Sequence, residues 1–224
     1  MSKHLELDLE QVKRELLSLS ALVEDMILKA TRALREQRSD LAQAVIDSDV
    51  QVNQREVQIE EEALKIIALH QPVAIDLRRI VAVVKINNDL ERIADLAVNI
   101  AERADQLILF PEFPIPDLLD RMAQRSIAMV GEAIDAFVRL DVAAAEQIRD
   151  ADDEVDKMNV ELIASLREVM RTQPELVEPA LQCFSATRHL ERIADHATNI
   201  AEDVVFLVQG EIARHKPNPT ALPK

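Results

Sequence analysis

Two distant segments of the chain carry the same arrangement of acidic and amide side chains. Residues 90–102 read LERIADLAVNIAE and residues 190–202 read LERIADHATNIAE, so the copies differ only at their seventh and ninth positions. Residues 78–89 and 178–189, which precede them, share no identical position, so a duplication has drifted almost everywhere else. The polar residues shared by the copies, besides the arginines, are Glu91, Asp95, Asn99 and Glu102, and Glu191, Asp195, Asn199 and Glu202.

These side chains are suited to binding cations. On a helix, Glu91, Asp95, Asn99 and Glu102 fall within a stripe about 80° wide, opposite the apolar face. Carboxylates at positions i and i+4 repel each other mildly unless something neutralises them. A divalent or trivalent cation would do so, and carboxylates can bridge metals about 3.5–4 Å apart. All the ligands offered are oxygens, which favours Mg, Ca, Mn or iron over structural zinc. The alternative is an ordinary solvated helix face.

A second pair of acidic segments strengthens the metal hypothesis. Asp49 and Asn53, in D-x-x-V-N-x-x-E, resemble Asp152 and Asp156, in D-x-x-V-D-x-x-N. Antiparallel pairing about turns near residues 72 and 174 places each pair level with the acidic stripe of the following helix. Reflection about a turn at Ser39 brings Asp25 to the same height, with Glu132 as a looser counterpart in the second half. Ordinary exposed acids remain the alternative for all of these residues.

The elements that position these residues are predicted to be six long helices. Proline breaks helix interiors, and the nine prolines leave long stretches rich in helix-forming residues. Ser39 or Asp40 can cap one helix start and Asp141 another, because such side chains accept the first N–H bonds of a helix. The predicted helices span residues 5–37, 40–70, 74–110, 117–139, 142–172 and 176–212. The fold class is therefore all-α, with sequential helices as antiparallel neighbours.

The prolines also predict the domain organisation. A Pro-rich linker, residues 111–116, separates a three-helix repeat at 1–110 from a second at 117–213. Residues 214–224, with three prolines, are predicted to form a flexible tail.

Composition narrows the classes of partner. The chain of 224 residues has 41 acidic and 26 basic side chains and a net charge of −15, so it repels nucleic acid and anionic lipid. No apolar run approaches the ~18 residues needed to span a bilayer. One cysteine, Cys183, fits a reducing compartment and is expected to be a buried thiol. His189 and His196 are expected at a surface or interface.

The duplicated E-R-I-A-D segments at 91–95 and 191–195 resemble the signature of the PhoU family of bacterial phosphate-signalling proteins. Residues 71–78, QPVAIDLR, are similar to the family's turn into the third helix. The resemblance implies two tandem antiparallel three-helix bundles related by pseudo-twofold symmetry. It also implies multinuclear metal clusters at Glu91/Asp95, Glu191/Asp195 and Asp152/Asp156. Asn53 departs from the pattern because an amide replaces the second acid, and the second half lacks the Asp-Leu-Arg element.

The resemblance further implies a non-catalytic, metal-binding adaptor that negatively regulates phosphate uptake and phosphate-starvation signalling. Its expected partners are the ATPase subunit of a phosphate ABC transporter and a sensor histidine kinase. The expected metal is iron, manganese, magnesium or zinc. The protein is expected in the cytoplasm as a homodimer, associated with membrane proteins but not inserted.

Two alternatives compete with this adaptor hypothesis. One is a helical-bundle carboxylate metalloenzyme, although the Glu-x-x-His pairs of common di-iron bundles are absent from both repeats. The other is a passive helical scaffold, in which substitution at Glu91 and Asp95 would alter neither metal content nor signalling. No Gly-rich phosphate loop or nucleophile–base pair indicates any other enzyme class, so no catalytic residue is predicted.

Overall fold

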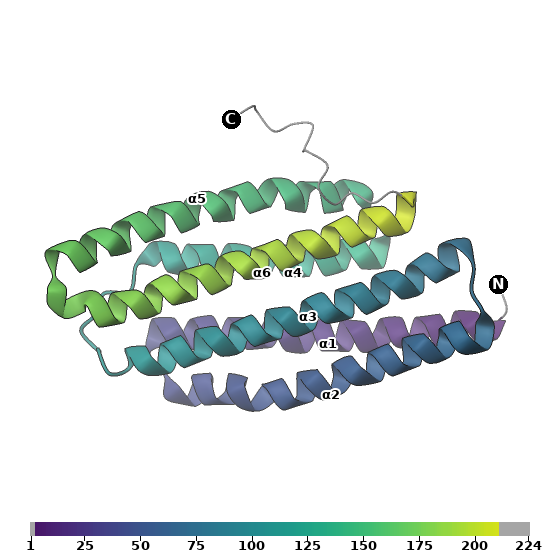
Figure 1. Cartoon of the computed structure of the whole chain (residues 1–224), viewed down its shortest axis with the longest axis horizontal. Helices are drawn as coiled ribbons and strands as arrows, with labels where there is room; N and C mark the ends of the chain where they lie inside the picture. The colour runs from purple at the N-terminus through teal and green to yellow at the C-terminus, as the bar shows by residue number, and fades with distance from the viewer. Residues whose placement is uncertain (1–2, 211–224) are drawn as a thin grey trace.

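The computed structural model describes residues 3–210, which contain six long α-helices and one short 3₁₀ helix and no β-strand (Figure 1). The helices are α1 (Lys3–Glu36), α2 (Ser39–His70), α3 (Ala74–Leu107), α4 (Asp117–Arg139), α5 (Val142–Thr172), η1 (Pro174–Leu176) and α6 (Val177–Gln209). The all-α prediction is confirmed. The predicted tail at 214–224 lies outside the described residues.

The six helices form two three-helix bundles that lie side by side, α1–α3 below and α4–α6 above in Figure 1. Helices α3 and α6 run antiparallel and pack against each other at the centre, and α1 contacts α4. Helices α2 and α5 contact only helices of their own half, so each has an outer face. The prediction of two three-helix bundles related by pseudo-twofold symmetry is confirmed.

Helix ends follow local backbone chemistry. Helix α3 ends at Leu107, three residues before the predicted end, because Phe110 N–H bonds Leu107 O at 2.9 Å in a tighter i→i+3 turn. Pro111 then prevents continuation. Helix α6 ends at Gln209, where Gly210 takes φ 76° and its N–H bonds Phe206 O.

The predicted caps were right at one helix and wrong at another. Asp141 caps α5, since its side chain accepts the backbone N–H of Ala144 at 3.0 Å. Neither Ser39 nor Asp40 caps α2, because the N-cap position falls on Arg38, which makes no side-chain cap bond. The Ser39 hydroxyl instead donates to Asp105 of α3 at 2.8 Å.

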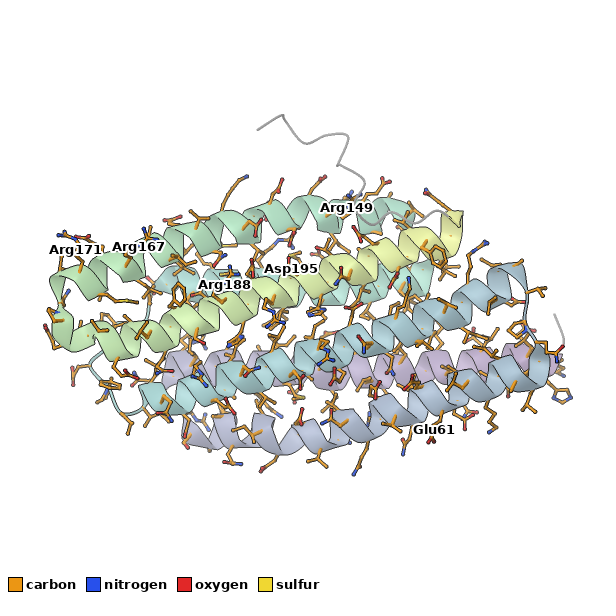
Figure 2. All side chains as sticks on the ribbon, viewed as in Figure 1. Glu61, Arg149, Arg167, Arg171, Arg188 and Asp195 are labelled. Atoms are coloured by element: carbon orange, nitrogen blue, oxygen red, sulfur yellow. The ribbon has the colours of Figure 1, made fainter. Side chains whose placement is uncertain are left out.

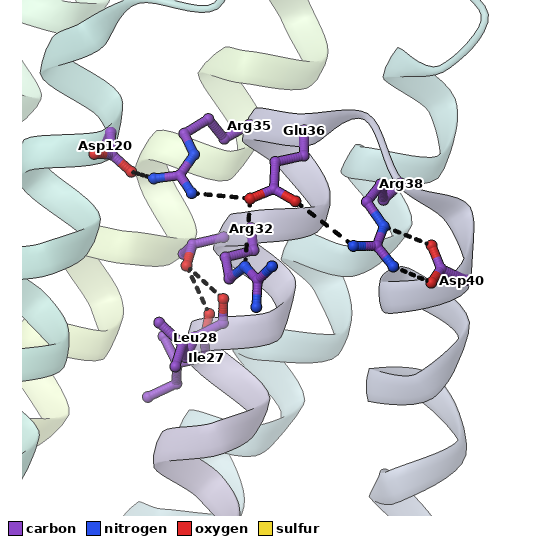
Figure 3. Close-up of polar contacts among 9 residues, drawn as sticks. Ile27, Leu28, Arg32, Arg35, Glu36, Arg38, Asp40 and Asp120 are labelled. Carbon is purple, nitrogen blue, oxygen red and sulfur yellow. Dashed lines mark hydrogen bonds and ion pairs between the residues drawn. The ribbon is translucent and has the colours of Figure 1, made fainter.

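Charged side chains pair around the α1–α2 turn and between α1 and α4 (Figure 3). Arg35 lies 3.1 Å from Asp120 of α4 and 3.0 Å from Glu36. On the other side of the turn, Arg38 pairs with Asp40. These pairs are exposed, so each contributes little to stability.

The core is continuous across the two bundles. Leu90, Ile93 and Ile100 of α3, and Ile193 and Ile200 of α6, have at most 1% of their surface exposed. These are the apolar positions of the two repeated segments, so the repeat has an apolar face that forms the α3–α6 core. Its polar face is thereby held on the opposite side of each helix.

Candidate metal centres

The first acidic cluster consists of Glu91 and Asp95 of α3 with Asp49, Asn53 and Glu56 of α2. The helices bring these residues level, as antiparallel pairing predicted. Burial and the charge of Asp95 raise the pKa of Asp49. Burial and the charge of Asp95 also raise the pKa of Glu91, with Glu56 and Asp49 adding smaller repulsions. Asn53 donates to Asp49 at 2.9 Å across one turn of α2.

Two carboxylate oxygens of this cluster are buried and accept no hydrogen bond, namely Asp49 Oδ1 and Glu91 Oε2. Arg92 Nε lies 3.4 Å from Glu91 Oε2, so these adjacent residues form an ion pair. Buried acceptors are rarely left without a partner. A bound cation would supply the missing partner and would remove the repulsion that raises these pKa values.

The second acidic cluster consists of Glu191 and Asp195 of α6 with Asp152 and Asp156 of α5. Figure 2 labels Asp195 midway along α6, two turns after Arg188. Burial, followed by the charges of Asp195, Asp156 and Asp153, raises the pKa of Asp152 to about 7. Burial and neighbouring carboxylates also raise the pKa values of Glu191 and Asp195. Glu191 Oε2, like its counterpart Glu91 Oε2, is buried without a hydrogen bond.

Both clusters are open arrangements of carboxylates. Within residues 3–210, no three His, Cys, Asp or Glu side chains are gathered closely enough to hold one ion as they stand. The donor type nevertheless fits a hard cation, because each cluster offers oxygens from two helices and an unsatisfied buried carboxylate oxygen.

We expect the metal-free protein to lose stability as the pH rises from about 4 to about 7. The folded state holds a proton on Asp152 up to about pH 7, whereas the unfolded chain releases it near 3.8. The folded state therefore binds more protons in this interval, and the free energy of unfolding falls as pH rises. Allowing for solvent screening of this partly exposed group, the loss is about 1–2 kcal/mol.

Urea unfolding with a chelator at pH 5 and pH 8 measures this loss. Asp152→Asn should remove most of it and be more stable than the metal-free wild type at pH 8. Glu161→Gln, at an exposed position of α5, serves as the control and should not change the pH dependence. An equal stability difference between wild type and Asp152→Asn at both pH values would show that Asp152 titrates normally.

Several predicted site residues have other partners in the structure. Asn99 donates to the backbone carbonyl of Asp95 at 2.8 Å, and Asn199 donates to Asp89 at 3.4 Å. Glu102 pairs with Arg103 at 3.1 Å, and Glu202 lies 4.0 Å from Arg149. Their assignment as ligands stays a prediction.

Asp25 also has its own partner. It is exposed and pairs with Lys29 one turn along α1. It is not among the charges that raise the pKa values of Asp49 and Glu91. Its counterpart Glu132 pairs with Arg125 at 3.2 Å. The role of Asp25 as a metal ligand stays a prediction.

Glu56, the acid that ends the D-x-x-V-N-x-x-E segment of α2, also belongs to the first cluster. Burial and the charge of Glu60 raise its pKa. Its position three residues after Asn53, on the same helix face, was the available signal. In the second half the corresponding position is Asn159, which is buried with its Oδ1 accepting no hydrogen bond.

The remaining singled-out side chains are two histidines and one cysteine of α6. His196 Nδ1 is 2.8 Å from Asp89 Oδ1 across the two bundles, which confirms its predicted place at an interface. Beside it, Lys85 Nζ lies 2.7 Å from Asp203 Oδ1. His189 is partly buried and its Nε2 is 3.2 Å from the Ser185 hydroxyl. Cys183 is a core thiol, as predicted, and burial raises its pKa to about 12.

Comparison with known proteins decides the family. Residues 16–104 and 119–204 each match the PhoU domain, so both three-helix halves are covered. The chain belongs to the PhoU family. The two matches coincide with the two bundles and each contains one acidic cluster. The resemblance inferred from the duplicated motif is thereby confirmed.

Relatives and solved structures match the chain over almost its whole length. It is 40% identical to the phosphate-specific transport system accessory protein PhoU homolog of Pseudomonas aeruginosa, covering 96% of this chain and 89% of that protein. The Escherichia coli phosphate-specific transport system accessory protein PhoU is 32% identical over 93% of this chain and 86% of its own length.

The fold is that of PhoU crystal structures. The structure of PhoU from Pseudomonas aeruginosa, 40% identical, superposes with a TM-score of 0.89 over 92% of this chain and 99% of that one. The phosphate transport system regulatory protein PhoU from Streptococcus pneumoniae gives 0.88 at 29% identity, over 93% and 98%. Among the helices of the described range, none is apolar over a length that would cross a bilayer.

Proposed function

We propose that this protein is a metal-binding accessory protein that restrains phosphate uptake and phosphate-starvation signalling. Support for the phosphate role comes from relatives that are named accessory proteins of the phosphate-specific transport system and match over 93–96% of this chain. The protein acts without catalysis of its own, by presenting a surface to its partners.

The observation that carries the metal-binding part is the recurrence of an acidic cluster in both halves. The first cluster would hold a cation through Asp49, Glu91 and Asp95. The second would hold one through Asp152, Asp156, Glu191 and Asp195. When bound, iron, manganese, magnesium or zinc would neutralise the carboxylates and change the charge of the surface. The second cluster has Asp156 where the first has Asn53, and the first has Glu56 where the second has Asn159, so each cluster offers four carboxylates.

The proposed partners are the ATPase subunit of a phosphate ABC transporter and a sensor histidine kinase. The protein would meet both on the cytoplasmic side, without membrane insertion and as a homodimer. With a net charge of −15, it is suited to basic protein surfaces rather than to anionic lipid.

Deletion of the gene in its host, followed by measurement of labelled phosphate uptake, tests the regulatory proposal. Cells lacking the protein should continue rapid uptake after transfer to high phosphate, because the restraint on the transporter is gone. Cells carrying a restored copy should slow their uptake. Equal uptake in the two strains would contradict the proposal.

A further inference from the structure

An exposed apolar stripe runs along the outer face of α2. Val50, Val57 and Leu64 are 61%, 49% and 57% exposed. Their seven-residue spacing keeps them nearly in line on a helix, over about 21 Å. Because α2 contacts only α1 and α3, no other described helix covers this face. We call these three residues the α2 stripe.

The second half shows that the fold does not require the α2 stripe. The buried positions of α2 match those of α5 at an offset of 103 residues, for example Val52 with Val155 and Ile59 with Leu162. At this offset the stripe positions correspond in α5 to Asp153, Val160 and Arg167. All three are exposed, and Figure 2 places Arg167 on the outer edge of α5.

The α2 stripe differs in polarity from the corresponding positions of α5. Two of the three α5 positions are charged, as expected for a solvated face. The corresponding positions of α2 are all apolar, although their exposure is similar. Apolar residues in line on an exposed helix face are typical of contact with another helix.

The charges beside the α2 stripe indicate which kind of helix would contact it. Asp47, Glu60 and Glu61 lie within about 80° of the stripe on one side or the other. Lys65 is the one base in the same zone, and Lys65 and Glu62 lie 3.2 Å apart. Figure 2 shows Glu61 on the outer edge of α2, away from the bundle. The stripe is therefore apolar at its centre and acidic at its flanks.

We propose that the α2 stripe is the docking surface for a basic amphipathic helix of a partner protein. Apolar side chains of that helix would cover Val50, Val57 and Leu64, and its lysines or arginines would face the acidic flanks. A second copy of this chain does not fit, because pairing two such stripes would bring acidic flanks against acidic flanks. The inference deepens the proposed function by naming the surface that meets a partner, and it rests on that function.

The matched variant exchanges the stripe for residues that the fold already accepts. Val50→Asp combined with Leu64→Arg copies the residues found at the corresponding positions of α5 and leaves the net charge unchanged. Val160→Asp on α5 is the control, since it removes an exposed valine from the other half. Circular dichroism should show unchanged helicity and melting for both proteins.

Binding is measured by fluorescence anisotropy with a labelled synthetic peptide. The peptide, about 20 residues long, carries leucine on one helical face and lysine on both flanks, and a scrambled peptide of equal composition is the control. The stripe variant should bind the amphipathic peptide about tenfold more weakly than wild type does, and Val160→Asp should match wild type. Equal affinity of wild type and stripe variant, or equal binding of the scrambled peptide, would overturn the proposal.

Sedimentation and complementation complete the test. If the stripe variant loses an oligomeric form that wild type has, the stripe contacts a second copy and the proposal is wrong. In a deletion strain, wild type and Val160→Asp should restore control of phosphate uptake, and the stripe variant should not. Failure of wild type itself to restore control would contradict the proposed function. Restoration by the stripe variant would contradict only the docking surface.

Discussion

Bound manganese or iron should fall to background when Glu91, Asp95, Glu191 and Asp195 are all replaced by alanine. Each cluster then loses both of its acids from α3 or α6, and the acids left on α2 and α5 face no partner across the helix pair. Carboxylates from a single helix bind a hard cation weakly, because its coordination needs several oxygens. Elemental analysis of protein purified without an affinity tag or chelator gives the measurement.

The two double variants divide the effect between the halves. Glu91→Ala/Asp95→Ala and Glu191→Ala/Asp195→Ala should each remove about one cluster's share of metal. Glu10→Ala/Glu161→Ala, at exposed acids on α1 and α5, is the control and should retain full metal content. Metal content that is undiminished in the quadruple variant would show that the ions, if any, bind elsewhere.

The stability of the quadruple variant shows whether it has lost metal ligands or has lost its fold. Burial and mutual repulsion raise the pKa values of Glu91, Glu191 and Asp195 in the metal-free protein. Alanine removes that repulsion, so the quadruple variant should be at least as stable as metal-free wild type at pH 8. Added manganese should raise the melting temperature of wild type and leave that of the variant unchanged.

The second large effect is expected in cells. In a strain lacking the gene, wild-type protein should keep phosphate-starvation transcripts low in high phosphate. The quadruple variant should leave them near the level of the deletion strain, because the metal-dependent surface is no longer presented. Quantitative measurement of these transcripts, with immunoblots to confirm equal protein levels, gives the result.

Comparison of the control and quadruple variants tests whether repression depends on the bound metal. The Glu10→Ala/Glu161→Ala control should repress as wild type does. Full repression by the quadruple variant, combined with loss of its metal, would show that regulation does not depend on the ions. Flat transcript levels in the deletion strain itself would contradict the regulatory role altogether.

The sequence by itself was enough to determine the helices and the identity of the two acidic stripes. Proline breaks the interior of a helix, so Pro72, Pro111 and Pro174 mark real breaks, and the helical period places Glu91 and Asp95 on one face. Short connections make neighbouring helices antiparallel, which placed Asp49 and Asp152 at the right height. These inferences succeeded because they depend on local geometry.

Only the tertiary structure decided which side chains of each stripe meet the neighbouring helix. Glu91 and Asp95 face α2, whereas Glu102, further along the same face, pairs with Arg103. Likewise, Asn199 contacts Asp89 of the other bundle. Helical period fixes the direction of a side chain on its own helix, but not the rotation of that helix against its neighbours or the angle at which they cross. That rotation is set by how the apolar faces of α3 and α6 pack together.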